Sequence, residues 1–534
     1  MLKETLRVET SRRVFLQAAG AMGIVATLAA CSGPASTNKP AATETGAPVD
    51  ENGTIDAGIS YPLSTGFDPM TTTGAVTVAA NWHTLEGLVE LDPISREPYA
   101  ALAADLPSAD GTTITVALRK GAVFHDGSPV TADDVVFSFQ RVLDPANNSL
   151  YRTFIPFVSG VEKIDENTVE ITLNQKFSLA VERLSVVKIV PQAIVTADPA
   201  AFDALPTGTG PYKITSAVKD DKLTFERNDA YTGSRPALAA AMTWNLLSDA
   251  AARVTAVQSG RVQAIEDVPY IDVANLSKDS TVESVQSFGQ LFMMFNCEAA
   301  PFDDVRVRQA FRYAIDYDKL VNVGMLGQAT PATSYLQQEH PSYQKAKTVY
   351  TYDVKKAKKL LAAAGVSDLS ITLLATDTSW VKDVLPLIKE DLDAVGIATT
   401  IDANQSGAQY KIVDSGAYTV MVAPGDPSVF GNDADLLLRW WYGADTVWPS
   451  KRYRWADSEG FAELTALLDD AVATGDTEKQ AKLWGQAFDL IAEECPVYPL
   501  VHRKLPTAWD ADALADFEPL AFTGLSFLDV ARRG

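Results

Sequence analysis

Cysteine and histidine are both scarce in this chain of 534 residues, which has 3 cysteines and 4 histidines. There is no CxxC pair, and the histidines are widely scattered, with no ligand spacing such as HxxxH. A dithiol redox centre, a structural zinc site and a nickel site each need such a cluster. We therefore expect no metal and no cofactor.

Long apolar runs and an excess of positive charge are also lacking. After residue 31 no apolar stretch approaches the length of roughly 18 residues that a transmembrane helix needs. The formal net charge is −23, and such an acidic surface repels nucleic acid and anionic lipid headgroups. Nucleic acid is therefore not an expected partner.

Familiar catalytic signatures are missing as well. The chain has no GxSxG, HExxH or P-loop, and Gly208-Thr209-Gly210 lacks the third glycine of GxGxxG. We therefore predict no catalytic residue. Paired carboxylates are abundant in so acidic a chain, so a secreted hydrolase that uses Asp or Glu stays open as an alternative.

The N-terminus has the features of an export signal. Arg12 and Arg13 precede a mildly apolar run from Ala18 to Ala30. This run is too short, and its side chains are too small, to span a bilayer. The paired arginines resemble a twin-arginine signal, and Leu28-Ala29-Ala30-Cys31 resembles a lipobox. We expect residues 1–30 to be a signal peptide and Cys31 to carry lipid on the outer face of the cytoplasmic membrane. The alternative is a short hydrophobic helix that stays in the protein.

A segment without apolar periodicity follows the lipobox. Residues 31–53 are rich in Ala, Thr, Pro, Gly and Ser, which predicts a flexible stalk between the lipid and the globular part. Two further cysteines, Cys297 and Cys495, lie far downstream. The sequence leaves open whether they pair or are buried as separate thiols.

Capping residues and periodicity place several elements. Thr131 precedes two acids and an apolar run, which predicts a helix N-terminus. Asp353 caps a predicted helix that Gly365 ends. A strand, a helix and a strand then predict a β-α-β unit and a parallel or mixed sheet at Leu369–Ala375, Trp380–Val395 and Ile397–Ile401.

Segments along nearly the whole chain resemble those of one protein family. They are Leu118–Arg141 (LRKGAVFHDGSPVTADDVVFSFQR), Pro206–Tyr212 with Arg227–Tyr231, Phe295–Asp316, Tyr352–Gly365 and Pro496–Leu500. In this order they resemble family 5 of the extracellular solute-binding proteins, which serve peptide, nickel and opine ABC importers. An alternative for His125-Asp126 in the first segment is a catalytic pair, but Asp-Gly favours a turn, where adjacent side chains seldom face each other.

The resemblance implies an α/β fold of the two-lobed periplasmic-binding-protein type II, with mixed sheets and an extra subdomain on the first lobe. Crossing strands at Phe292–Asn296 and Val497–Val501 would form the hinge. The implied boundaries are 54–92, 186–289 and 499–534 for the first lobe, 93–185 for the inserted subdomain and 290–498 for the second lobe.

The function that the resemblance implies is capture of a solute, with no chemistry. We expect a lipid-anchored, monomeric receptor that encloses a dipeptide or oligopeptide between closing lobes and delivers it to an ABC permease and its ATPase subunits. An oligosaccharide or another solute of low charge is the alternative ligand.

The ligand-binding residues also follow from the resemblance. In the peptide-binding branches an aspartate, three residues before an Asp-Pro, pairs with the ligand's α-ammonium. An ungapped match places Ala423 at that position and Asp426 at the later one, and a short shift of the loop makes Asp426 the ammonium partner. The dipeptide branch holds the carboxylate with an arginine, but the matching loop Thr376–Trp380 contains none.

Aromatic residues complete the predicted site. Phe430, Trp440, Tyr442 and Trp380 are the candidates, because aromatic faces suit sugar rings and apolar side chains alike. Strand-like alternation in Trp440-Trp441-Tyr442 would turn Trp441 away from its neighbours. Ordinary core packing is the open alternative for this cluster.

Overall fold

A computed structural model describes residues 47–444 and 446–534 of the chain. The predicted export signal, with Arg12 and Arg13, and the predicted lipid attachment at Cys31 lie outside the described residues. In the part that is described, no helix combines the length and the apolar character needed to cross a membrane.

The last residues of the predicted stalk (31–53) are attached to the other end of the chain. Val49 forms a β-bridge with Arg533, and the Asp50 N–H donates to the Arg532 carbonyl over 2.7 Å. The stalk therefore ends earlier than predicted, because these backbone groups find hydrogen-bond partners at the C-terminus.

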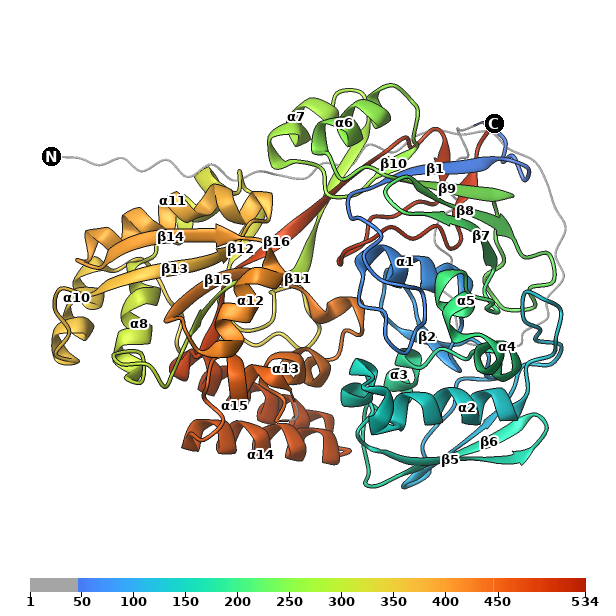
Figure 1. Cartoon of the computed structure of the whole chain (residues 1–534), viewed down its shortest axis with the longest axis horizontal. Coiled ribbons are helices and arrows are strands. Elements are labelled where there is room, and N and C mark those ends of the chain that lie inside the picture. Colours follow the sequence, from blue (N-terminus) through green and yellow to red (C-terminus); the bar gives the residue numbers. More distant parts are fainter. Residues whose placement is uncertain (1–46, 445) are drawn as a thin grey trace, which may run out of the picture. The chain divides into compact units, whose positions relative to one another are not determined.

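A mixed sheet of eleven strands runs through the described part of the chain (Figure 1). In spatial order its strands are β14 (Ala398–Asn404), β13 (Ser370–Thr376), β15 (Val420–Gly425), β11 (Thr281–Phe295), β16 (Val497–Trp509), β10 (Ala264–Ile265), β1 (Thr54–Ile59), β9 (Ala241–Leu246), β8 (Lys222–Arg227) and β7 (Tyr212–Val218), with β12 (Ala329–Pro331) beside β16. Parallel and antiparallel pairs both occur, which confirms the predicted α/β class with mixed sheets.

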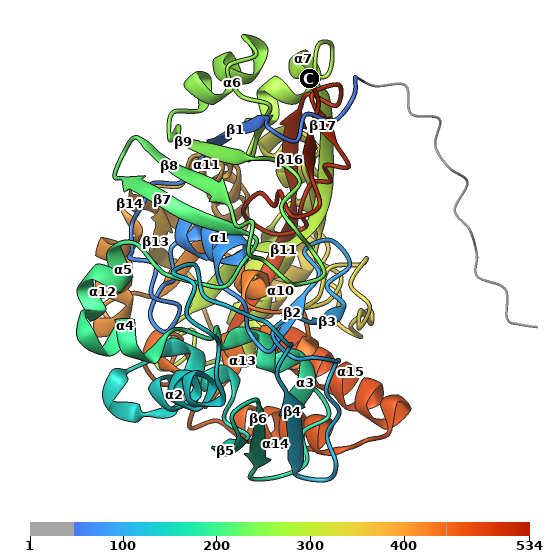
Figure 2. The same ribbon diagram turned by 90° about the vertical axis from the view of Figure 1, so that its right-hand side faces the viewer.

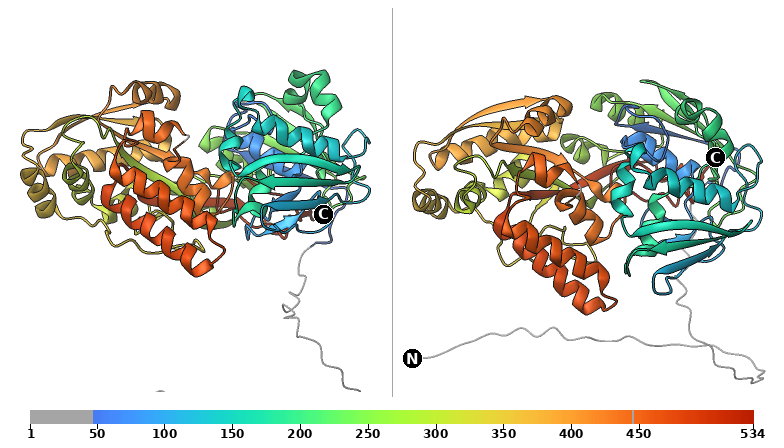
Figure 3. Two further views of the ribbon diagram at one scale, coloured as in Figure 1. Left: turned by 90° about the horizontal axis from the view of Figure 1, so that it is seen from below. Right: turned by 60° about the horizontal axis from the view of Figure 1, so that its bottom comes forward.

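Two long antiparallel strands, β11 and β16, belong to both halves of this sheet (Figures 1 and 3). Their pairing shifts register between Gln286, opposite Lys504, and Gln290, opposite His502. We call residues 47–286 and 504–534 lobe I and residues 290–502 lobe II. The predicted crossing segments pair with each other within lobe II, and the register shift lies just before them in β11 and just after them in β16.

Lobe II contains the predicted β-α-β unit. β13 and β14 are parallel from Ser370 opposite Ala398 to Thr376 opposite Asn404, and α11 connects them, which confirms the unit. Its helical segments are α8 (Val305–Ala314), α9 (Tyr317–Lys319), η5 (Leu320–Gly324), α10 (Val354–Ala363), α11 (Ser379–Ala394), α12 (Ser406–Ser415), η6 (Pro427–Val429), α13 (Ala434–Tyr442), η7 (Trp448–Arg452), α14 (Glu459–Ala473) and α15 (Thr477–Glu494).

Lobe I carries a layer built on a second, three-stranded sheet. We use the name subdomain for residues 93–185, which contain this sheet and the helix α2. At the start of α2, Thr131 and Asp134 form a reciprocal capping box, which confirms the predicted N-terminus. The subdomain comprises β3 (Pro98–Ala100), β4 (Thr113–Ala117), α2 (Ala132–Leu143), η1 (Pro145–Asn147), η2 (Leu150–Phe154), β5 (Val158–Asp165), β6 (Thr168–Leu173), α3 (Ala180–Arg183) and the start of η3 (Leu184–Val186).

Lobe I has nine further helices and strands among its described residues. They are α1 (Ala75–Thr84), β2 (Val89–Leu91), α4 (Gln192–Ala197), α5 (Pro199–Ala204), α6 (Ala250–Gln258), η4 (Tyr270–Asp272), α7 (Val273–Leu276), β17 (Leu514–Ala515) and β18 (Ala531–Arg532). β2 pairs with β3, so a turn between them connects lobe I to the subdomain.

The apolar core is not divided in the way that the lobes are. One cluster of buried side chains runs from the subdomain into lobe II, and a separate cluster fills lobe I around β1, β8 and β9. The Ser178 N–H of the subdomain donates to the Val472 carbonyl at the end of α14 over 2.9 Å, and α2 and α14 lie at the same end in Figure 2. The subdomain therefore packs against lobe II.

The two downstream cysteines are free thiols in this structure. Cys495 is buried and Cys297 is half-buried. Burial raises the pKa of Cys297 to about 12 and also raises the pKa of Cys495, so both thiols are held in the uncharged, unreactive form.

Candidate functional site

A cavity of about 350 Å³ lies where lobe I, lobe II and the crossing strands meet. Lobe I contributes Tyr61 and the first turns of α1, and lobe II contributes the end of β15 and the η6 turn. Gln290 and Arg503 line the cavity from β11 and β16. A site built from both lobes and from the strands that connect them changes its shape whenever the lobes move.

Most of the sequence-predicted site residues line this cavity. Asp426 and Phe430 come from the segment after β15, Trp440 comes from α13 and Trp380 from the start of α11. They are up to 60 residues apart in sequence, and the fold of lobe II brings them together.

Tyr442 lies elsewhere, in the core of lobe II. Its side chain is 1% exposed, and its hydroxyl donates to the Val497 carbonyl. The predicted strand-like alternation was wrong, because Asp433 caps a helix here and accepts from the Leu436 N–H over 2.8 Å. On a helix, successive side chains turn by about 100°, so Trp440 faces the cavity while Tyr442 faces the core.

Asp426 has one satisfied oxygen and one unsatisfied oxygen. Its Oδ1 accepts from the Ser428 N–H over 3.0 Å and from the Ser428 hydroxyl. Its Oδ2 is buried and accepts no hydrogen bond from any described residue, and the same holds for the Oε1 of Gln290. Burial raises the pKa of Asp426, although Ser428, Arg503 and Arg96 oppose the shift. Two unsatisfied acceptors in one cavity suit a positively charged donor.

An aromatic wall, of which Phe430 and Trp440 line the cavity, continues into the subdomain. Trp440 stacks on Phe430 with 5.3 Å between ring centroids, and on Phe154 of the subdomain with 6.0 Å. Tyr151, also in η2, meets Phe430 edge to face at 5.6 Å. The wall therefore joins side chains of lobe II to side chains of the subdomain.

Arg503 is a site residue that the sequence analysis missed. It stands in β16 where the strands cross, and its guanidinium lies 4.8 Å from the ring centroid of Trp380. Its Nη2 donates to Asp267 Oδ1 over 2.6 Å, and its buried Nε has no acceptor among the described residues. In sequence it belongs to an ordinary strand, so only the crossing of the strands reveals its place.

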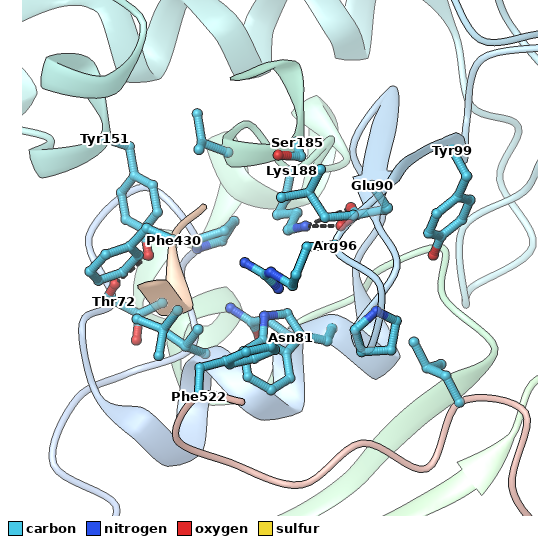
Figure 4. Close-up of a pocket in the computed structure, with 18 residues that line it drawn as sticks. Thr72, Asn81, Glu90, Arg96, Tyr99, Tyr151, Ser185, Lys188, Phe430 and Phe522 are labelled. Carbon is cyan, nitrogen blue, oxygen red and sulfur yellow. Dashed lines mark hydrogen bonds and ion pairs between the residues drawn. The ribbon is translucent and has the colours of Figure 1, made fainter. Parts of the chain in front are cut away.

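Arg96 is a second missed residue, in a smaller pocket of about 70 Å³ beside the cavity. Figure 4 shows its side chain in the middle of this pocket, close to Phe522. Its Nη2 donates across the interface to the Ser428 carbonyl over 2.8 Å. The backbone φ of Arg96 is 62°, a left-handed conformation that non-glycine side chains disfavour. The sequence gives no sign of this strain.

Arg183 fixes the subdomain to lobe II. Its Nε and Nη2 each lie 2.7 Å from an oxygen of Asp433, and Nη2 lies 2.9 Å from Asp435. The three side chains are 2%, 6% and 0% exposed, respectively. Burial alone would raise the pKa of Asp433, but the Arg183 charge outweighs it, so the pKa of Asp433 lies below its ordinary value.

Residues 47–444 and 446–534 contain no metal-site candidate. No three or more of their His, Cys, Asp or Glu side chains form a group that could hold a metal ion. All four histidine side chains are hydrogen-bonded to backbone atoms; they are His83, His125, His340 and His502. Burial lowers the pKa of each of them, so the rings are neutral at physiological pH.

Known proteins are similar to this chain over most of its length. The family model of the bacterial extracellular solute-binding proteins, family 5 (middle part), matches residues 97–449. The chain is 30% identical to the glutathione-binding protein GsiB of Shigella boydii over 481 residues, which cover 87% of this chain and 92% of GsiB.

Solved structures share the arrangement of lobes. The dipeptide-binding protein of Pseudoalteromonas sp. SM9913 in complex with Met-Leu has a TM-score of 0.79 at 21% identity, covering 90% of this chain and 100% of that one. The binding protein AgaA of A. tumefaciens R10 in complex with agropinic acid also has a TM-score of 0.79, at 27% identity, with 90% and 99% covered. These likenesses confirm the predicted two-lobed fold.

Proposed function

Because the chain belongs to family 5 of the bacterial extracellular solute-binding proteins, whose members bind peptides or similar ligands for ABC importers, we propose that it is a receptor for short peptides. It binds the peptide between its lobes, performs no chemistry on it, and delivers it to a permease.

The observation that carries the proposal is the unsatisfied Oδ2 of Asp426. This oxygen and the Oε1 of Gln290 line one cavity and accept no hydrogen bond from the described residues. A peptide's α-ammonium donates up to three hydrogen bonds and carries the charge that a buried carboxylate needs. Asp426 is therefore the proposed ammonium partner.

The aromatic wall supplies contacts for the rest of the peptide. Trp440 and Phe430 present apolar faces from lobe II, and Trp380 carries the Arg503 guanidinium above its ring. Ligand that touches both lobes stabilises the closed arrangement, because it makes both sets of contacts only when the lobes are together. The closed, loaded form is what a permease can distinguish from the open form.

Anchoring completes the proposed function. Arg12 and Arg13 would direct export, and a lipid on Cys31 would hold the receptor on the outer face of the membrane, beside its permease. Intact-mass measurement of the membrane fraction tests this step: a Cys31→Ser variant should lose the diacylglyceryl mass and leave the membrane. A variant that stays membrane-bound at unchanged mass would show that the anchor is not at Cys31.

The binding proposal is tested by calorimetry with Ala-Ala-Ala and its N-acetylated form. Removing the charged ammonium should weaken binding by about a hundredfold or more, because Asp426 is then left buried without a charged partner. Asp426→Asn should weaken Ala-Ala-Ala binding comparably. Asp377→Asn is the matched control, an exposed acid at the end of the neighbouring strand, and should bind as the wild type does.

Other outcomes would assign a different function. Binding of cello- or xylo-oligosaccharides but of no peptide would replace the peptide with a sugar on the aromatic wall. Turnover of any of these ligands, lost on substitution of Asp or Glu, would contradict the receptor function itself.

A further inference from the structure

The guanidinium of Arg96 has few hydrogen-bond partners and no ion-pair partner among the described residues. The one hydrogen bond that its side chain makes to the described residues goes to the Ser428 carbonyl, and the side chain forms no ion pair with their carboxylates. Its Nε is buried and has no acceptor there. Burial lowers the pKa of Arg96 to about 10, although the carboxylates of Asp426, Asp92 and Glu90 oppose the shift. A guanidinium in such a place lacks the charged acceptor for which it is suited.

The surrounding pocket does not supply that acceptor. Glu90 is the pocket's carboxylate, and it is already paired with Lys188 and with the Gly87 N–H. Figure 4 shows the Lys188–Glu90 pair to one side of Arg96 and Phe430 to the other. The Phe522 ring lies 4.2 Å from the guanidinium carbon, so it holds the charged group in the pocket without neutralising it.

The same pocket also holds an unsatisfied acceptor, which suits a donor of the ligand and not its carboxylate. Asn81 in α1 is 3% exposed, and its Nδ2 donates to the Phe67 carbonyl over 2.9 Å. Its Oδ1 is buried without a donor among the described residues. The pocket volume of about 70 Å³ leaves room for a small polar group that accepts from Arg96.

Ser428 connects this pocket with the proposed ammonium partner. Its carbonyl accepts from Arg96, while its N–H and hydroxyl donate to Asp426 Oδ1. The pocket and the main cavity also share Val429 and Phe430 as walls. A positive group and a negative group therefore both contact Ser428.

We infer that Arg96 is a specificity-determining residue that binds a carboxylate carried by the same ligand residue whose ammonium Asp426 binds. The inference rests on the proposed function. Such a carboxylate has two chemical sources: the side chain of an N-terminal aspartate or glutamate, or the free α-carboxylate of a γ-linked glutamyl residue. Both place a carboxylate within a few bonds of the ammonium.

Calorimetry with four peptides tests the inference: Ala-Ala-Ala, Gln-Ala-Ala, α-Glu-Ala-Ala and γ-Glu-Ala-Ala. The wild type should bind at least one glutamyl peptide about tenfold or more tightly than Gln-Ala-Ala. Arg96→Met should abolish that preference, so that it binds both glutamyl peptides and Gln-Ala-Ala with equal affinity. Arg96→Lys keeps the charge without the fork-shaped donors and should restore part of the preference.

Arg152→Met is the matched control, because Arg152 is an exposed arginine of the same subdomain. It should keep the full preference. The glutamyl peptide that loses affinity in Arg96→Met identifies the source of the carboxylate. Equal binding of both glutamyl peptides and Gln-Ala-Ala by the wild type, or a preference that survives Arg96→Met, would overturn the inference and leave the peptide receptor intact. Failure of the wild type to bind any of the four peptides would instead overturn the proposed function, and the inference with it.

Discussion

Two arginines of the subdomain reach lobe II, and they are paired in opposite ways. Arg183 meets Asp433 and Asp435 with three short hydrogen bonds, and it also donates to the Phe154 carbonyl over 2.7 Å. The Arg96 side chain makes a single hydrogen bond, to a carbonyl, and no ion pair with the described residues. Both side chains cross the same interface, but of the two only Arg183 has charged partners within the described part of the protein.

The difference separates a structural contact from a binding contact. A buried charge whose partners come from the protein contributes the same energy whether or not a ligand is present. A buried charge without a partner lowers the stability of the protein until a ligand supplies the opposite charge. A ligand that lacks this charge leaves the penalty in place, so the receptor selects ligands that carry it. Arg183 therefore holds the subdomain against lobe II, and Arg96 is reserved for the solute.

The largest expected change in stability follows from breaking the ion pair between Arg183 and Asp433. Arg183→Met leaves Asp433 buried without its cation, which should lower the free energy of unfolding by about 3–5 kcal/mol. Asp435 suffers less, because Arg439 also pairs with it at 2.8 Å. Guanidinium unfolding followed by tryptophan fluorescence measures the change.

The matched control removes the acid as well. A double variant, Arg183→Met with Asp433→Asn, should regain part of the lost stability, because no buried charge is then left without a partner. If Arg183→Met alone unfolds like the wild type, the ion pair contributes nothing to stability and the contrast with Arg96 fails.

The features that could be predicted from the sequence are those that depend on residues close together in the chain or on segments shared with a family. Local signals placed the Thr131 cap and the β-α-β unit, because capping and periodicity depend on neighbouring residues. Family resemblance led to Asp426, and the suitability of aromatic faces for sugar rings and apolar side chains led to Trp440; both line the cavity. Tyr442 was misplaced since three aromatic residues are too few to distinguish a helix from a strand.

Arg96 and Arg503 were invisible to sequence reasoning for a different reason. Arg96 stands in the turn between β2 and β3, and Arg503 in the middle of β16. Arg503 reaches the cavity, and Arg96 the smaller pocket beside it, only through the packing of the lobes. Whether an arginine is paired depends on residues far away in sequence. Arg183 and Asp433, 250 residues apart, show the same limit.

A smaller effect of opposite sign is expected at Asp426. The buried Oδ2 of Asp426 has no donor among the described residues, so Asp426→Asn should raise the free energy of unfolding at pH 7 by about 1 kcal/mol while it weakens peptide binding. The raised pKa of Asp426 means that the ionised carboxylate costs stability above that pKa.

The stability difference between Asp426→Asn and the wild type should depend on pH. As the pH falls through the raised pKa of Asp426 towards its ordinary value of about 3.9, the carboxylate is protonated and the cost disappears. The advantage of Asp426→Asn over the wild type should therefore be largest at neutral pH and vanish near pH 4, as thermal unfolding across that range would show. An advantage that grows with acidity would mean that Asp426 is stabilising in its ionised form.

The smallest effect on stability is expected at Arg96 itself. Arg96→Met removes one hydrogen bond to the Ser428 carbonyl but also removes a half-buried charge that has no ion-pair partner among the described residues, so the free energy of unfolding should change by less than about 1 kcal/mol. Guanidinium unfolding under the conditions used for Arg183→Met gives the direct comparison. A loss as large as that of Arg183→Met would show that Arg96 is a structural tie between subdomain and lobe II. A small change, combined with lost selectivity for glutamyl peptides, is the combination expected only of an arginine whose partner arrives with the ligand.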